Sequence, residues 1–263
     1  MPTVIACVDA FATRPFEGNQ AAVCLLERPR PTRWLQRFAA EMNLAETAFV
    51  ESNGRQLKLR WFTPTTEMPL CGHATLAAAH VLWHEGRVRK DATIRFKTMS
   101  GELTAVRNGK SIDLDFPSEP PIETPAPAGL VEALGIKPVW LGRNRLDYIV
   151  EAASESQVRE LQPNLAALAR VDARGVIVTA KGPGRTYHFI SRFFAPAVGI
   201  PEDPVTGSAH CCLAPYWSEK LKKNSMVGFQ ASARTGYVRV RLSGSRVTLS
   251  GNAVMVYRGV LTA

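Results

Sequence analysis

Residues 70–83, LCGHATLAAAHVLW, and residues 205–217, VTGSAHCCLAPYW, decide how this 263-residue chain folds. In each stretch a glycine among small residues precedes an apolar run that has no polar face. A surface helix would keep one polar face, so each run predicts a central helix surrounded by strands. Pro215 lies within the second run and predicts that this helix is kinked or shorter than the first.

The two runs belong to a weak internal repeat. Gly72 and Gly207 are 135 residues apart, and the same separation relates Gly101 to Gly236 and Gly109 to Gly244. Upstream, Arg60-Trp-Phe-Thr-Pro64 resembles Arg192-Phe-Phe-Ala-Pro196. Glycine marks backbone positions that a side chain would obstruct, so a repeated glycine spacing indicates duplication of one structural unit.

Short alternating segments predict strands around each helix. They cover 57–62, 93–96, 103–106 and 112–116 in the first half, and 186–194, 237–242 and 247–249 in the second. Five prolines between Asp115 and Gly129 indicate a linker. We therefore predict an α+β fold with halves at about 1–116 and 129–263, joined by a linker at 117–128, in which strands can cross between the halves.

Composition restricts the function classes. The chain is 46% hydrophobic, enough for well-buried cores, and its net charge is +9 with the positive residues scattered. Scattered charge without a nucleic-acid motif predicts no nucleic-acid partner, whereas a basic surface suits a small anionic substrate. Five cysteines without CxxC spacing predict neither a disulfide framework nor a zinc ribbon, which favours the cytoplasm. Neither a leader peptide nor a membrane span is predicted.

The starts of the two predicted helices carry the first chemical signal. The amides at Gly72-His73 and at Gly207-Ser208 have no acceptor within their helices. Each helix start also carries about half a positive charge from the helix dipole. Two such ends facing each other would form an anion site, and a carboxylate is a natural guest. For one turn alone, the simpler interpretation is that glycine permits a tight helix entry; the repetition favours the anion site.

Glu46 is the second signal, because it interrupts a sequence that otherwise leads into an apolar strand, Asn43-Leu-Ala-Glu-Thr-Ala-Phe-Val50. A buried carboxylate costs free energy unless it is paired or used. A general base that later returns its proton is one such use. A surface position or a helix-capping role would equally explain Glu46 from the pattern alone.

Six motifs in order resemble the PhzF family along the whole chain. They are Val8-Asp-Ala-Phe11, Gly18-Asn-Gln-Ala-Ala-Val23, Asn43-Leu-Ala-Glu-Thr47, Phe62-Thr-Pro64, Leu70-Cys-Gly-His-Ala-Thr75 and Glu202-Asp-Pro-Val-Thr-Gly-Ser-Ala209. The resemblance implies the diaminopimelate-epimerase-like α+β fold, with two pseudo-symmetric halves that each roll a sheet around a central helix, and with the active site between them. It also implies a homodimer without cofactor or metal.

The resemblance further implies an isomerase or epimerase that acts on a small carboxylate, such as an amino or hydroxy acid. In the phenazine enzyme, which isomerises trans-2,3-dihydro-3-hydroxyanthranilate, a glutamate moves a proton from one ring carbon to another. Glu46 matches that glutamate. His73 and Asp203 match further catalytic positions, and the matching substrate contacts are Asn19, Cys71, Gly72, Thr206, Gly207 and Ser208.

Cys71 allows an alternative mechanism in which a thiol is the catalytic base. Related epimerases and racemases carry a catalytic thiol at this position, but the counterpart in the second half is Thr206, so a two-thiol racemase is not expected. A thiol-based dehydratase or racemase that uses Cys71 is the first alternative. A non-catalytic binding protein with a PhzF-like fold is the second, although such a protein would have no reason to keep Glu46, His73 and Asp203 together.

Two further groups of potential ligand residues, a histidine pair and a cysteine pair, lie in or next to the two apolar runs. His80 and His84 are four residues apart on a predicted helix, but the carboxylate of an HExxH metal motif is missing. They are therefore expected to be core or helix-surface histidines. Cys211 and Cys212 are expected to be small buried side chains.

Overall fold

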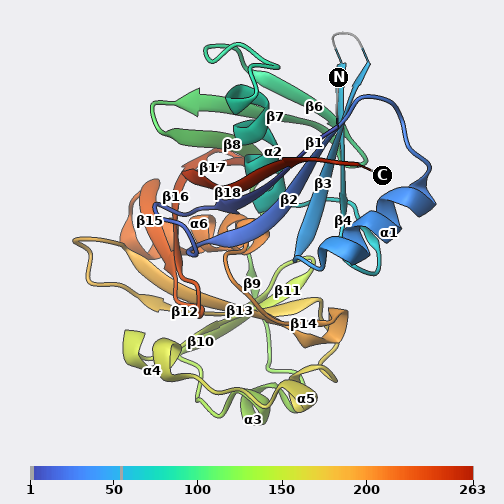
Figure 1. The fold of residues 1–263 in the computed structure, drawn as a ribbon. Coiled ribbons are helices and arrows are strands. Elements are labelled where there is room, and N and C mark those ends of the chain that lie inside the picture. The colour runs from blue at the N-terminus through green and yellow to red at the C-terminus, as the bar shows by residue number, and fades with distance from the viewer. Residues whose placement is uncertain (1–2, 54–55, 263) are drawn as a thin grey trace. The chain divides into compact units, whose positions relative to one another are not determined.

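The apolar run after Gly72 forms helix α2 (Gly72–His84) in the computed structural model, which describes residues 3–53 and 56–262 (Figure 1). Nearly every residue of α2 from His73 to Trp83 is buried, as a helix without a polar face requires. Four strands contact it: β1 (Val4–Ala10), β2 (Asn19–Leu26), β3 (Glu46–Asn53) and β18 (Ala253–Val260). The prediction of a central helix surrounded by strands is confirmed.

Contacts divide the chain into two units. Residues up to Phe116 and from Ser250 onward form the first unit, and Pro117–Leu249 form the second. The end of the chain thus belongs to the first unit rather than to the second half, because β18 pairs antiparallel with β1 along its whole length. The proline-rich segment belongs to the second unit and contains a short strand, β9.

The first unit rolls one sheet around α2. Its strands pair in the order β18, β1, β2, β3, β4, β6, β7, β8, with β2 parallel to β3 and β4 parallel to β6, and β5 pairs with β4. Helix α1 (Thr32–Met42) connects β2 to β3 and packs on Cys24, Leu26 and Phe49. The strand bounds are β1 Val4–Ala10, β2 Asn19–Leu26, β3 Glu46–Asn53, β4 Gln56–Phe62, β5 Glu67–Met68, β6 Ile94–Thr98, β7 Gly101–Asn108, β8 Ser111–Pro117 and β18 Ala253–Val260.

The second unit repeats this pairing around α6 (Gly207–Leu221). Here β11 is parallel to β12, β12 antiparallel to β13, β13 parallel to β15, and β15 antiparallel to β16. Its remaining bounds are β9 Ile122–Glu123, α3 Leu130–Leu134, β10 Trp140–Arg143, β11 Asp147–Glu151, α4 Glu155–Glu160, α5 Leu165–Leu168, β12 Gly175–Lys181, β13 Phe189–Ala195, η1 Pro196–Val198, β14 Ile200–Asp203, β15 Ser225–Gln230, β16 Gly236–Ser243 and β17 Arg246–Gly251.

Equivalent residues repeat between the two units, at a separation of 135 residues for Gly109 and Gly244 and for Glu67 and Glu202, and of 132 residues for Arg60 and Arg192. Gly109 and Gly244 occupy tight turns with φ of 61° and 56°, a conformation that disfavours residues with a side chain. A salt bridge of 2.7 Å joins Arg60 to Glu67 in the first unit, and another of 2.7 Å joins Arg192 to Glu202 in the second. The repeat read from the sequence is therefore a repeat of structure.

Of the two outcomes predicted from Pro215, a kinked or a shorter helix, the shorter helix is wrong, because α6 spans 15 residues and α2 spans 13. Pro215 has no N–H to donate to the carbonyl of Cys211, four residues earlier. That carbonyl accepts a hydrogen bond of 3.1 Å from the Glu119 backbone N–H instead. The segment before β9 thus supplies the donor that proline lacks, and the helix continues.

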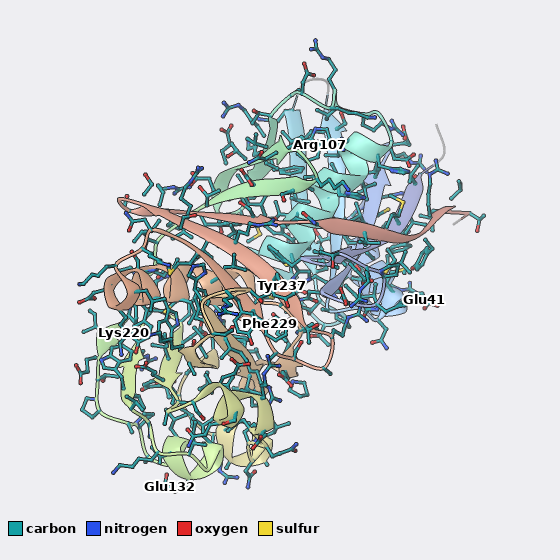
Figure 2. All side chains as sticks on the ribbon, turned by 90° about the vertical axis from the view of Figure 1, so that its left-hand side faces the viewer. Glu41, Arg107, Glu132, Lys220, Phe229 and Tyr237 are labelled. Atoms are coloured by element: carbon teal, nitrogen blue, oxygen red, sulfur yellow. The ribbon has the colours of Figure 1, made fainter. Side chains whose placement is uncertain are left out.

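Besides the apolar residues of its central helix, each unit has a second buried apolar cluster, which includes α1 residues in the first unit and residues of α3, α4 and α5 in the second. In the first unit, exposed residues such as Glu41 lie on the outer side of the ribbon, as Glu132 does in the second (Figure 2). None of the helices among the described residues is long and apolar enough to span a membrane.

Candidate active site

Asn19 is placed in the first half of the site by the turn that precedes it, and this turn requires a glycine at position 18. Gly18 has φ of +67°, and a Cβ there would lie 2.2 Å from the carbonyl oxygen of Ala10. Only a residue without a side chain allows this approach. The turn starts β2 at Asn19, whose side chain is fully buried.

Glu46 is the first residue of β3. Before it, Asn43 ends α1 in the left-handed conformation with φ of 49°, which asparagine tolerates better than most residues. The chain can therefore reverse within three residues and enter the sheet. Glu46 is only 7% exposed, so the sequence interpretation of a carboxylate at the start of a buried strand is confirmed.

The start of α2 brings two more side chains to Glu46. Nε2 of His73 lies 3.1 Å from Oε2 of Glu46, an ion-pair distance but not a well-aligned hydrogen bond. On the other side of the ring, Nδ1 lies 3.2 Å from the amide nitrogen of Asn19 and 3.6 Å from the sulfur of Cys71. In the neutral ring Nδ1 accepts from Asn19, which leaves the proton on Nε2 beside Glu46.

The electrostatics of this cluster favour a charged imidazole and a neutral thiol. Burial alone lowers the pKa of His73, but hydrogen bonding to Cys71 and the negative charge of Glu46 raise it, and the pKa is well above 6.5. Burial, and then the negative charge of Glu46, raise the pKa of the Cys71 thiol. Cys71 is the N-cap residue of α2, and no side chain caps the helix start.

The same three side chains are, among the described residues, the one group of three or more His, Cys, Asp or Glu side chains that could hold a metal ion. The ligand atoms of Glu46, Cys71 and His73 all lie within 4.8 Å of one another. A metal ion would bind Cys71 as a thiolate and would release its proton.

The second unit contains the other predicted residues. Asp203 ends β14 and accepts a hydrogen bond of 2.5 Å from the hydroxyl of Thr206, the N-cap residue of α6. The buried Gln230 holds both: its amide nitrogen donates to the Asp203 carbonyl at 2.7 Å, and its amide oxygen accepts from the Thr206 N–H at 2.8 Å. This network fixes the loop that enters α6.

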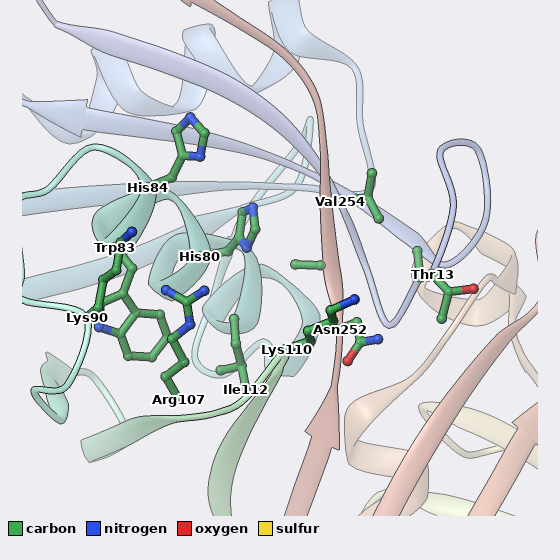
Figure 3. A pocket seen from close by; sticks show the side chains of 12 residues that line it. Thr13, His80, Trp83, His84, Lys90, Arg107, Lys110, Ile112, Asn252 and Val254 are labelled. Carbon is green, nitrogen blue, oxygen red and sulfur yellow. The ribbon is translucent and has the colours of Figure 1, made fainter.

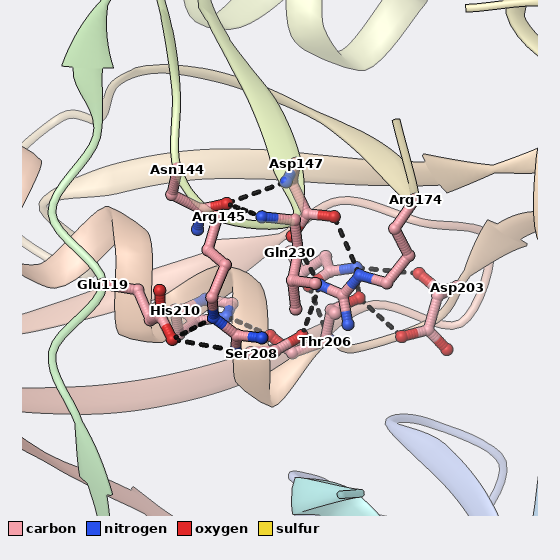
Figure 4. A network of polar contacts seen from close by, with 11 residues as sticks. Glu119, Asn144, Arg145, Asp147, Arg174, Asp203, Thr206, Ser208, His210 and Gln230 are labelled. Carbon is pink, nitrogen blue, oxygen red and sulfur yellow. Dashed lines mark hydrogen bonds and ion pairs between the residues drawn. The ribbon is translucent and has the colours of Figure 1, made fainter. Parts of the chain in front are cut away.

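Ser208, in the first turn of α6, belongs to a second network (Figure 4). Its hydroxyl accepts a hydrogen bond of 3.0 Å from Arg174, and both Nε and Nη2 of that guanidinium bind the carboxylate of Asp147. Asp147 is 1% exposed, and burial raises its pKa although the Arg174 guanidinium opposes the rise. Arg174 is thereby fixed at the start of α6.

The predicted residues therefore fall into two groups. The first unit holds Asn19, Glu46, Cys71, Gly72 and His73, and the second holds Asp203, Thr206, Gly207 and Ser208. Sequence reasoning missed Gln230, Arg174 and Asp147, which reach the start of α6 from strands or strand ends far along the chain. None of these three residues lies in a recognisable motif. The only sequence signal for Gln230 is the alternation of buried and exposed side chains along its strand, which would have predicted that it is buried. Cys211 and Cys212 are buried within α6, as expected.

Comparison with known proteins places the whole chain in one family. The family model for phenazine biosynthesis-like proteins, PhzC-PhzF, matches residues 8–259. An uncharacterized isomerase of Halalkalibacterium halodurans is 52% identical over 262 residues, with 99% of each chain covered. A phenazine biosynthesis-like domain-containing protein of Mus musculus is 43% identical and covers 100% of this chain and 99% of its own.

Solved structures agree. A PhzF-family protein of Enterococcus faecalis superposes with a TM-score of 0.95 at 39% identity, and each chain is fully covered. At 11% identity, a hydroxyproline epimerase of Agrobacterium vitis shares the fold alone, with a TM-score of 0.66 and coverage of 100% of this chain and 95% of its own. The fold is therefore the diaminopimelate-epimerase-like α+β fold, and the chain belongs to the PhzC/PhzF family of phenazine biosynthesis-like proteins.

Proposed function

We propose that this protein is a cofactor-independent isomerase or epimerase that moves a proton between two positions of a small carboxylate substrate. The observation that carries the proposal is the buried cluster in which Glu46 lies 3.1 Å from His73 at the uncapped start of α2. Burial keeps water from the carboxylate, and a carboxylate in such a place is suited to accept and return a proton.

Glu46 carries the chemistry in this proposal. Its carboxylate removes a proton from a substrate carbon, and the electron pair of that C–H bond moves into the neighbouring unsaturated or carboxyl group. The protonated Glu46 then delivers a proton to another carbon, or to the other face of the same carbon. The carboxylate is regenerated, and the product has the composition of the substrate.

His73 is proposed to supply positive charge to the reaction. Its raised pKa keeps the imidazole protonated at neutral pH, beside the place where negative charge develops on the substrate. The side-chain amide of Asn19 lies 3.2 Å from Nδ1 and holds the charged ring in position when its oxygen, rather than its nitrogen, faces the Nδ1 proton. The free amides at the start of α2 add partial positive charge to the same region.

The second unit is proposed to bind the polar groups of the substrate. Gly207 and Ser208 begin α6 after the N-cap residue Thr206, and no side chain caps this helix start, so their N–H groups suit a carboxylate. Asp203, held by Thr206 and Gln230, suits an amine. Relatives named isomerases, 52% and 48% identical to this chain, support the reaction class.

The raised pKa of Cys71 disfavours the thiol-based alternative. A catalytic thiol must lose its proton to act as a base, and such thiols have lowered pKa values. Here burial and the charge of Glu46 act in the opposite direction. We assign Cys71 a packing role against the substrate.

A screen of small carboxylates in deuterated water tests the proposal. Amino and hydroxy acids, with and without ring unsaturation, are incubated with the protein, and products are followed by NMR and mass spectrometry. At least one compound is expected to give an isomer of unchanged composition apart from deuterium. Loss of water from the substrate would instead support the thiol dehydratase, and binding without turnover by any compound would support the non-catalytic alternative.

A further inference from the structure

The first unit contains a pocket that the proposed chemistry does not use (Figure 3). Its volume is about 510 Å³, within the range of small-molecule sites. His80 lies seven residues after His73 on α2, which is about 10 Å along the helix axis. The lining comes from α2, the turn after it, the β7–β8 hairpin, the start of β18 and the end of β1: His80, Trp83, His84, Lys90, Arg107, Lys110, Ile112, Asn252, Ala253, Val254, Ala12 and Thr13.

The charged lining of the pocket has one sign. Lys90, Arg107 and Lys110 contribute three positive charges, His80 and His84 contribute two imidazoles, and the lining contains neither Asp nor Glu. Within the described part of the chain, none of the three cations forms a salt bridge. Arg107 donates only from Nε, to the Gly109 carbonyl at 3.3 Å, which leaves both terminal nitrogens of its guanidinium for a ligand. Several positively charged side chains that lie close together without acidic partners attract an anion.

His80 is half-buried in the lining of the pocket, near these cations. Burial, and then the nearby His84 and Arg107, lower the pKa of His80 to about 4. The ring is therefore neutral at physiological pH and can donate one hydrogen bond. The two imidazoles, with ring centroids 6.2 Å apart, could in principle hold a metal ion, but three neighbouring cations would repel it and no carboxylate assists. The surroundings favour an anion over a metal.

Two buried apolar side chains also line the pocket, Trp83 and Ile112, and both lie close to Arg107 (Figure 3). Trp83 is 3% exposed, and Ile112 is likewise 3% exposed. The indole Nε1 of Trp83 is buried, and within the described residues it has no hydrogen-bond partner. A buried donor without a partner is unfavourable. The pocket therefore combines a cationic rim, formed by Lys90, Arg107 and Lys110, with two buried apolar side chains.

We propose that this pocket is a second ligand site of the protein, and that it binds a small organic phosphate. Three cations exceed what a monocarboxylate would neutralise, and they match the charge of a phosphate or diphosphate group. Guanidinium and ammonium groups are the usual partners of such groups. The indole and Ile112 leave room for an apolar body attached to the phosphate. The proposal does not depend on the reaction assigned to Glu46.

Inorganic pyrophosphate is the probe for the test, and imidazole NMR of the full-length protein is the readout. The protein has five histidines, so the signals can be assigned by substitution. Saturable binding is expected to shift His80 and His84 and to raise the pKa of His80 by about one unit or more, because an anion stabilises the charged ring. Signal changes centred on His73 would place the anion at the start of α2 and would overturn the proposal.

Two double variants, each of which removes two positive charges, distinguish binding in this pocket from nonspecific electrostatic attraction of pyrophosphate to the protein. Arg107→Gln with Lys110→Gln removes two exposed cations of the rim and is expected to weaken pyrophosphate binding about tenfold or more. Arg95→Gln with Lys97→Gln removes the same charge from the neighbouring strand β6, outside the pocket, and is expected to leave binding within about twofold. Equal weakening by the two pairs, or no saturable binding to the wild type, would contradict the site.

Discussion

Nε2 of His73 lies 3.1 Å from Oε2 of Glu46, and both side chains are less than one tenth exposed. One residue comes from the first turn of a central helix and the other from the first position of a strand. Their contact brings a carboxylate and an imidazole together where water has little access. The electrostatic properties of this half of the site follow from that pair.

The His73–Glu46 pair predicts a pH-dependent contribution to stability. The pKa of His73 in the folded protein is above 6.5, its ordinary value, so the pair stabilises the fold fully below about pH 6.5 and loses this effect as pH rises through the raised pKa. Urea unfolding of wild type and His73→Gln should show a difference in free energy that shrinks toward alkaline pH. A difference that stays constant or grows between about pH 6 and 10 would contradict the raised pKa.

Cys71 separates the proposed mechanism from the thiol-based rival. Because its pKa is raised, the thiol stays neutral and contributes only packing. Cys71→Ser is expected to keep most of the turnover, within about tenfold in kcat/KM, whereas a nucleophilic or basic thiol would lose several orders of magnitude. Circular dichroism of the variant checks that folding is intact. An inactive but folded Cys71→Ser protein, together with an active Glu46→Gln protein, would reverse the assignment.

The Arg174–Asp147 pair predicts a large loss of stability in the second unit. Arg174→Gln leaves a carboxylate that is 1% exposed without its cation, so the free energy of unfolding should fall by about 3 kcal/mol or more. Adding Asp147→Asn removes the buried charge and should recover part of the loss. The exposed pair Arg89–Asp91 supplies the control, because Arg89→Gln should leave stability unchanged. Similar effects of Arg174→Gln and Arg89→Gln in urea unfolding would show that the buried pair is not structural.

Local sequence pattern predicted the parts of the fold that depend on neighbouring residues. The apolar runs after Gly72 and Gly207 formed the two central helices, and the alternating segments formed strands β4, β6, β7, β8, β13, β16 and β17. The pairing of β18 with β1 was not predicted, because it joins the two ends of the chain and no local pattern encodes it. The partner of the Cys211 carbonyl, and with it the length of α6, also depends on a distant segment.

The site residues likewise divide into those that local motifs predict and those that depend on contacts between distant segments. Motifs marked Asn19, Glu46, Cys71 and His73, and the structure brings these four together within the first unit. Gln230 lies 24 residues after Thr206 and Arg174 lies 34 residues before Ser208, at positions that no motif marks. These residues hold the site loops through long-range hydrogen bonds, which depend on the finished fold.

The proton transfer by Glu46 is the central claim, and the paired variants Glu46→Gln and Glu41→Gln test it most directly. Both remove one carboxylate near the same strand, but Glu41 is exposed on α1 and Glu46 is buried beside His73. The measurement is the rate of isomerisation and of deuterium incorporation in deuterated water, with the substrate found by the carboxylate screen. We expect Glu46→Gln to lose about a hundredfold or more in kcat and Glu41→Gln to match the wild type. A Glu46→Gln protein that isomerises the substrate at a near wild-type rate would contradict the assignment.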